Sequence, residues 1–237
     1  MSNLDIHKIT QTNFNNQKCY RLIPSKFPPI YLFEDVADHD EFEALYNIQK
    51  ITNPRLQEEL GDISLISQQD RVYGIMGASY IMAAFTHINP IGSRFSDGTF
   101  GIYYASENLK TAIQETSYHR QLFLWATNEP AQEIDMRCLG AYFSANLLNI
   151  CDNNLLNTEL YSKNSYKFSQ EFGIKTKIAQ ANGIYYHSVR SQPQQGKNFA
   201  LLKPKIFKKC IQESHYGYIW DGTKITDIYE KKLLSLG

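Results

Sequence analysis

A glutamate near the apolar face of a predicted helix is the first residue of this sequence that points to chemistry. The stretch GIYYASENLKTAIQETSYHR, residues 101–120, predicts a short strand followed by a helix, with Ser106 as the expected helix cap. Glu115 lies three residues after Ala112 and two after Ile113, close to the positions that face the core. Such a carboxylate is either a surface charge or a charge aimed at a pocket. The helix pattern by itself leaves both alternatives open.

Three further polar residues lie at unusual places in the predicted strands and loops. Arg21 falls inside a short strand, where a buried guanidinium needs an anionic partner. Arg94 lies in a loop rich in Gly and Ser that leads to a strand, and Ser188 follows the aromatic strand at residues 183–186. Taken singly, each has an ordinary explanation: an ion-paired arginine, a loop charge, a solvated serine. Only the order and spacing of the set favour a functional site.

The chain lacks the sequence motifs of several well-known kinds of functional site. The chain has no GxGxxG, GxxxxGK, HExxH or GxSxG, and none of its six histidines is spaced four residues from another. We therefore expect no metal site. The four cysteines show no CxxC spacing and the N-terminus is unlike a signal peptide, which predicts reduced thiols in a cytoplasmic protein.

The overall charge gives no reason to expect nucleic acid or a membrane as a partner. Lys plus Arg and Asp plus Glu each total 24, so no net field attracts a polyanion. The longest apolar run is too short and too interrupted by Gly and Ser to cross a bilayer. Any anionic ligand must therefore be bound by local charges.

The elements that position these residues predict an α+β protein. A helical pattern extends over about residues 40–89, and strands outnumber long helices after residue 95. Because regular crossover helices do not separate those strands, the pattern favours α+β over a doubly wound sheet. The length suits one domain, or a domain with a sizeable insertion.

An ordered set of short stretches resembles the RES domain family, which is named for its Arg, Glu and Ser. The stretches are YRL at 20–22, GSRFSDGTFGIYYAS at 92–106, TAIQET at 111–116, GIYYHSVR at 183–190 and GKNFALLKP at 196–204. The resemblance extends from about Cys19 to Pro204 and implies a fold similar to ADP-ribosyltransferases, with a mixed or antiparallel sheet. It implies one domain over residues 1–237, with a core at about 19–204 and a helical insertion at about 40–89.

The resemblance also implies roles for particular residues. Arg21, Glu115 and Ser188 match the arginine, glutamate and serine of the family, and Tyr103 matches a tyrosine on a strand of its site, with the adjacent tyrosine as the alternative. Arg94 matches the arginine of a GGRW loop, although GSRF departs from that loop at two positions. Members of the family are toxins of bacterial toxin–antitoxin pairs and consume NAD.

The chemistry that the resemblance implies is cleavage of the bond between nicotinamide and ribose, with NAD as a substrate and no cofactor. Glu115 is expected to offset the positive charge that develops at the anomeric carbon. Arg21, with Arg94 second, is expected to bind the pyrophosphate through a planar fork. Tyr103 is expected to stack on nicotinamide or the ribose, and Ser188 to bind a phosphate or the amide.

The acceptor and the partner remain open at this stage. Water makes the enzyme a glycohydrolase, inorganic phosphate a phosphorylase, and a protein side chain an ADP-ribosyltransferase. A catalytically silent nucleotide-binding regulatory module is the alternative from another class. The resemblance further implies an Xre-type helix-turn-helix antitoxin. This partner is expected to cover a cleft framed by Arg21, Tyr103, Glu115 and Ser188.

Overall fold

A seven-stranded mixed sheet forms the centre of the computed structural model, which describes residues 5–25, 31–52, 60–152, 155, 158–191 and 196–232. The strands are β1 (Gln11–Pro24), β2 (Tyr103–Ser106), β3 (Gln132–Asn149), β4 (Gly183–His187), β5 (Lys197–Leu201), β6 (Phe207–Trp220) and β7 (Ile225–Lys231). Their order is β1-β2-β5-β4-β3-β6-β7, and β1 also pairs with β3, so five of the strands close into a ring. The β3–β4 pair is parallel, and the other pairs are antiparallel.

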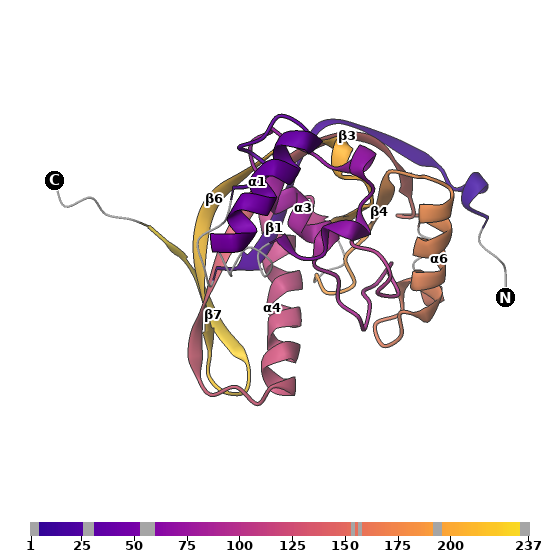
Figure 1. Ribbon diagram of the computed structural model, residues 1–237. Helices are drawn as coiled ribbons and strands as arrows, with labels where there is room; N and C mark the ends of the chain where they lie inside the picture. The colour runs from indigo at the N-terminus through magenta and orange to yellow at the C-terminus, as the bar shows by residue number, and fades with distance from the viewer. Residues whose placement is uncertain are drawn as a thin grey trace.

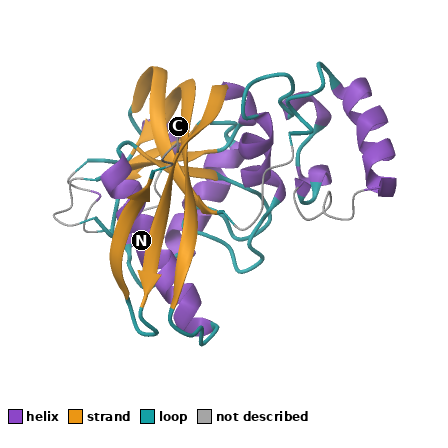
Figure 2. Ribbon diagram, turned by 90° about the vertical axis from the view of Figure 1, so that its left-hand side faces the viewer, coloured by secondary structure: helices purple, strands orange, loops and turns teal. Residues whose placement is uncertain are grey.

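The helices lie mostly to one side of the long strands, as Figures 1 and 2 show. The α-helices are α1 (His39–Thr52), α3 (Ala78–Thr86), α4 (Leu109–Ala126) and α6 (Lys167–Ile178). Short 3-10 helices occur at Ile6–Lys8, Ile63–Leu65, Gln68–Asp70, Glu159–Tyr161 and Pro204–Ile206. In Figure 1, α4 descends beside β7, and α6 lies far from it on the other side of the molecule. The α+β prediction is therefore confirmed, including the mixed sheet.

Three groups of buried side chains hold the helices to the sheet. The largest joins α1 and α3 to strand residues such as Tyr103 and Phe199, a second lies around Phe172 of α6, and a third packs Ala112 of α4 against Leu22 of β1. Burial of apolar surface on this scale is the dominant stabilising contribution in folding. The helical segment at 40–89 contributes α1 and α3 to the largest group, and its description as an insertion stays a prediction.

The start of α4 differs from the sequence-based expectation. Ser106 is not the helix cap, because it ends β2, where it pairs with Asn198 of β5. Asn108 caps the helix instead, and its side-chain oxygen accepts a hydrogen bond from the backbone N–H of Thr111 at 2.9 Å. The helix therefore begins at Leu109, and the Ser106 hydroxyl is available for another partner.

The described part of the chain has neither a helix that could span a membrane nor a cluster of potential metal ligands. None of its helices combines the length and apolar character that crossing a bilayer requires. Within the same residues, no cluster of three or more His, Cys, Asp or Glu side chains is placed to hold a metal ion.

Candidate active site

The Glu115 carboxylate is largely buried between α4 and the end of the β2–β5–β4 strands. Its side chain is 19% exposed. One oxygen, Oε1, accepts a hydrogen bond from the Ser188 hydroxyl at 2.6 Å and another from the Asn198 side-chain amide at 2.7 Å. The other oxygen, Oε2, lies 3.8 Å from Nε2 of His119, one helical turn further along α4. The two oxygens therefore have different surroundings.

Ser188 is fully engaged in hydrogen bonds directly after β4. Its side chain is buried, and its oxygen accepts from the backbone N–H of Arg190 at 3.1 Å and of Ser191 at 2.9 Å. The same hydroxyl donates to Glu115. A serine hydroxyl has one proton and two lone pairs, so these three bonds use its capacity. In this arrangement Ser188 holds the carboxylate and a turn of the chain together.

Asn198 is a member of this cluster to which sequence reasoning assigned no role. It is buried on β5, and its side-chain carbonyl accepts a hydrogen bond from the Ser106 hydroxyl at 2.7 Å. Ser106, Asn198 and Tyr186 occupy neighbouring positions across β2, β5 and β4, so their side chains share one face of the sheet. Asparagine is depleted in strands, and its position inside the stretch GKNFALLKP was the available signal.

Several positive charges act on His119, the imidazole that lies 3.8 Å from the Glu115 carboxylate. Desolvation lowers the pKa of His119, and Glu115 opposes that shift. Three arginines lie close enough to lower the same pKa: Arg190, Arg94 and Arg120. Because the imidazole is more readily neutral than usual, the positive charge near Glu115 at neutral pH comes from arginine side chains.

Two of these arginines already bind backbone carbonyls. Arg94 is buried, its Nη1 donates to the carbonyls of Leu160 and Ser162 at 3.3 and 3.2 Å, and its guanidinium lies 4.7 Å from the centre of the Tyr166 ring. Arg190 donates from Nη2 to the Lys163 carbonyl at 2.9 Å. These contacts tie the segment around residues 160–166 to the neighbourhood of Glu115. Both arginines contribute charge there while also serving a structural purpose.

Arg21 and Tyr103 form a separate pair. The Arg21 guanidinium donates to the backbone carbonyl of Tyr104 at 2.9 Å and lies 4.9 Å from the centre of the Tyr103 ring. Tyr20 pairs with Ser106 across β1 and β2, so alternation along these strands places Arg21 and Tyr103 on the face opposite Ser106. The structure thus brings Glu115 and Ser188 together, and it brings Arg21 and Tyr103 together at another place.

The two adjacent tyrosines on β2 have different surroundings. Tyr103 has no exposed surface, and burial raises the pKa of its hydroxyl well above the usual value. Tyr104 points to the same face as Ser106, and its hydroxyl contacts Ser93 at 2.9 Å and accepts from the backbone N–H of Phe95 at 2.9 Å. Tyr104 is therefore the tyrosine that shares a face with the residues around Glu115.

Comparison with known proteins places these residues in a family. The family model described as the RES domain matches residues 71–221, more than half of the chain. The chain belongs to the RES domain family. The match includes Arg94, Tyr103, Glu115 and Ser188, whereas Arg21 lies before its first residue.

Two individual proteins are similar to this RES domain over most of its length. The uncharacterized protein y4oC of Sinorhizobium fredii (strain NBRC 101917 / NGR234) is 30% identical over 210 residues, which cover 89% of this chain and 86% of that protein. A chain in the crystal structure of the M. tuberculosis MbcT–MbcA toxin–antitoxin complex aligns over 86% of both chains, with 8% identity and a TM-score of 0.45.

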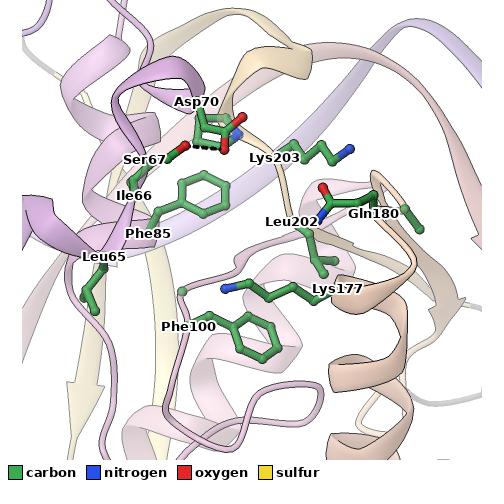
Figure 3. A pocket seen from close by; sticks show the side chains of 13 residues that line it. Leu65, Ile66, Ser67, Asp70, Phe85, Phe100, Lys177, Gln180, Leu202 and Lys203 are labelled. Carbon is green, nitrogen blue, oxygen red and sulfur yellow. Dashed lines mark hydrogen bonds between the residues drawn. The ribbon is translucent and has the colours of Figure 1, made fainter.

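A pocket of about 260 Å³ in this RES domain lies apart from the Glu115 cluster. None of the predicted site residues lines it, and Figure 3 shows Phe85, Phe100, Lys177 and Lys203 around it. The Lys177 ammonium lies 4.2 Å from the centre of the Phe100 ring, and burial lowers its pKa. The pocket also has a carboxylate that accepts from a serine hydroxyl, since Ser67 donates to Asp70 at 2.6 Å, but both residues are exposed, whereas Glu115 and Ser188 are largely buried. The Glu115 cluster is therefore the better candidate for catalysis.

Proposed function

We propose that this RES domain is an NAD-consuming toxin that cleaves the bond between nicotinamide and ribose. The observation that carries the proposal is the Glu115 carboxylate, which two donors hold through Oε1 while Oε2 is left for a substrate. A carboxylate held in place beforehand stabilises positive charge without the cost of reorienting solvent at the moment of reaction. Departure of nicotinamide from NAD produces such charge at the anomeric carbon.

The proposed reaction is a substitution at that carbon. The carbon–nitrogen bond breaks, its electron pair leaves with nicotinamide, and the acceptor oxygen forms the new bond. With water as acceptor the product is ADP-ribose and a released proton; with inorganic phosphate it is phosphorylated ADP-ribose. Glu115 interacts with the ribose and its developing charge, and Ser188 keeps the carboxylate in place.

Arginine side chains supply the charge for the pyrophosphate in this proposal. The charges of Arg190 and Arg94 act on His119, the neighbour of Glu115 on α4. Arg21 keeps the role of phosphate binding that the family resemblance implies. A guanidinium suits this purpose because its planar fork can donate to two phosphate oxygens at once. In the proposal, the ring that stacks on the substrate is that of Tyr104, which lies on the same face of the sheet as Ser106 and Asn198. The ring of Tyr103 is buried, so it could stack on the substrate only after becoming exposed.

The test is product identification by mass spectrometry after the purified protein is incubated with NAD, with and without phosphate. We expect release of nicotinamide, and the second product identifies the acceptor. Transfer of ADP-ribose to a protein side chain would show an ADP-ribosyltransferase instead. Absence of any nicotinamide release by the wild-type protein would contradict the proposed activity and favour the silent nucleotide-binding module.

Glu115→Gln is the decisive variant, because it keeps the shape of the side chain and removes its charge. We expect a fall in kcat of about 100-fold or more with little change in KM, since the charge matters most in the transition state. Glu107→Gln is a matched control: Glu107 accepts from the Tyr185 hydroxyl at 2.9 Å and has no bond to the Glu115 cluster. Equal activity of both variants would refute the role of Glu115.

A further inference from the structure

Asn198 links two elements that are distant in sequence to the same carboxylate. Its amide nitrogen donates to Oε1 of Glu115 on α4, and its carbonyl accepts from Ser106 at the end of β2. All three side chains lie within a continuous line of hydrogen bonds, each no longer than 2.7 Å. Asn198 and Ser106 are both buried, so water offers them little competition.

The orientation of the Asn198 amide follows from its neighbours. An ionised carboxylate can only accept hydrogen bonds, so the NH₂ end must face Glu115. The carbonyl end then faces Ser106, whose hydroxyl can donate to it. Because Ser106 and Asn198 are directly paired in the β2–β5 ladder, the backbone keeps the two side chains side by side.

The same contacts give the two oxygens of Glu115 different roles. Ser188 and Asn198 both donate to Oε1, from opposite ends of the cluster. Together they restrict rotation about the terminal torsion of the glutamate, which is otherwise broad. Oε2 keeps its lone pairs for a ribose hydroxyl and for the charge at the anomeric carbon.

We infer that Asn198, oriented by Ser106, is a positioning residue that holds Glu115 so that Oε2 is the oxygen that faces the substrate. This inference rests on the proposed function for its catalytic readout. Residues that hydrogen-bond to a functional side chain commonly change affinity or activity by about 10- to 100-fold when they are mutated, as is known for the residues that orient metal ligands. A purely structural asparagine would affect stability and leave the catalytic parameters of the folded protein unchanged.

The first test compares Asn198→Ala with Asn149→Ala for nicotinamide release from NAD. Asn149 is a matched control, because its side chain on β3 also makes two hydrogen bonds, to Thr12 and to the backbone N–H of Cys151, without contacting Glu115. We expect Asn198→Ala to lower kcat by about 10- to 100-fold with KM within about threefold, and Asn149→Ala to leave both nearly unchanged. Equal effects of the two variants would overturn the inference.

The second test is the pH profile of Asn198→Asp, which keeps the shape of the side chain. Two carboxyl groups that share a contact cannot both ionise easily, so one proton bound between them restores a donor toward Glu115. We expect low activity at neutral pH that rises as the pH is lowered, whereas wild-type activity falls or stays level over the same range. A variant profile parallel to that of the wild type would contradict the positioning role.

Two further measurements distinguish failure of the positioning role from misfolding of the variant and from failure of the proposed function. If Asn198→Ala does not fold, Ser106→Ala takes its place, because it removes only the hydroxyl that orients the amide. If the wild-type protein releases no nicotinamide, the proposed function fails, and the positioning of Glu115 is tested by NMR on the Asn198 side-chain amide. Its protons should exchange slowly and shift in Glu115→Gln and Ser106→Ala. An amide that is insensitive to both variants would refute the inference whatever the substrate.

Discussion

At the scale of single residues, the most informative contrast is between Glu115 and Arg21. Glu115 is held by side chains from β5 and from the segment after β4. Arg21 binds a backbone carbonyl and lies over the ring of Tyr103 on the other face of the sheet. The proposed pyrophosphate role of Arg21 therefore has to be separated from a role in holding β1 to β2.

The Arg21→Lys variant distinguishes pyrophosphate binding from a structural role in holding β1 to β2. Lysine keeps the charge and loses the planar fork, so the proposal predicts an affinity for NAD that is lower by roughly tenfold or more. Calorimetry in a Glu115→Gln background measures binding without turnover. An unchanged dissociation constant together with a lower unfolding temperature would assign Arg21 to structure alone.

At the scale of elements, the position of α3 depends on a close approach between backbones. Gly77 precedes α3 with a φ of 77°, and a Cβ placed there would lie 2.0 Å from the carbonyl oxygen of Cys210 on β6. The backbone N–H of Cys210 also donates to the Met76 carbonyl at 2.7 Å. Glycine is required here both for the left-handed conformation and for the contact between α3 and β6.

Gly77→Ala should therefore lower the free energy of unfolding by about 3 kcal/mol or more, because the strained φ and the clash add together. Gly222→Ala is the matched control: its φ is 97°, but the nearest atom to an added Cβ is 3.9 Å away. We expect that control to lose only about 1–2 kcal/mol. Chemical denaturation measures both, and similar losses would show that the contact with β6 contributes little.

At the scale of the whole molecule, the charge distribution matters more than the net charge. Lys plus Arg balances Asp plus Glu at 24 each, while the charges of Arg94, Arg120 and Arg190 all act on His119, which lies 3.8 Å from a carboxylate oxygen of Glu115. A local positive region in a neutral protein suits a small anionic substrate, or an acidic segment of a protein partner that covers the same residues.

Expression in a bacterium tests the toxin proposal in the intact chain. Expressed alone, the wild-type protein should stop growth and lower intracellular NAD, whereas Glu115→Gln should do neither. Expression together with the adjacent open reading frame should restore growth and NAD if that frame encodes the antitoxin. Normal growth with steady NAD during expression of the wild-type protein alone would contradict both the toxin and the need for an antitoxin.

Local sequence patterns were sufficient to predict the α+β class and the strand followed by a helix that carries Glu115. Both follow from local patterns, since periodicity and turn residues act over a few positions. The residue types and their order also led to the RES domain, because a family pattern is written along the chain. The start of α4 was wrong by two residues, because Ser106 is used by the β2–β5 ladder and Asn108 caps the helix.

Which polar residues come into contact depends on the packing of the whole chain. Ser188 is 73 residues from Glu115 in sequence and Asn198 is 83, and no local pattern specifies contacts over such separations. Alternation along β2 predicts that Tyr103 and Tyr104 face opposite ways, but packing against the helices determines which of them is buried. The pairing of β2, β5 and β4 brings Ser106 and Asn198 to Glu115, because strand register is set by long-range burial of one face of the sheet.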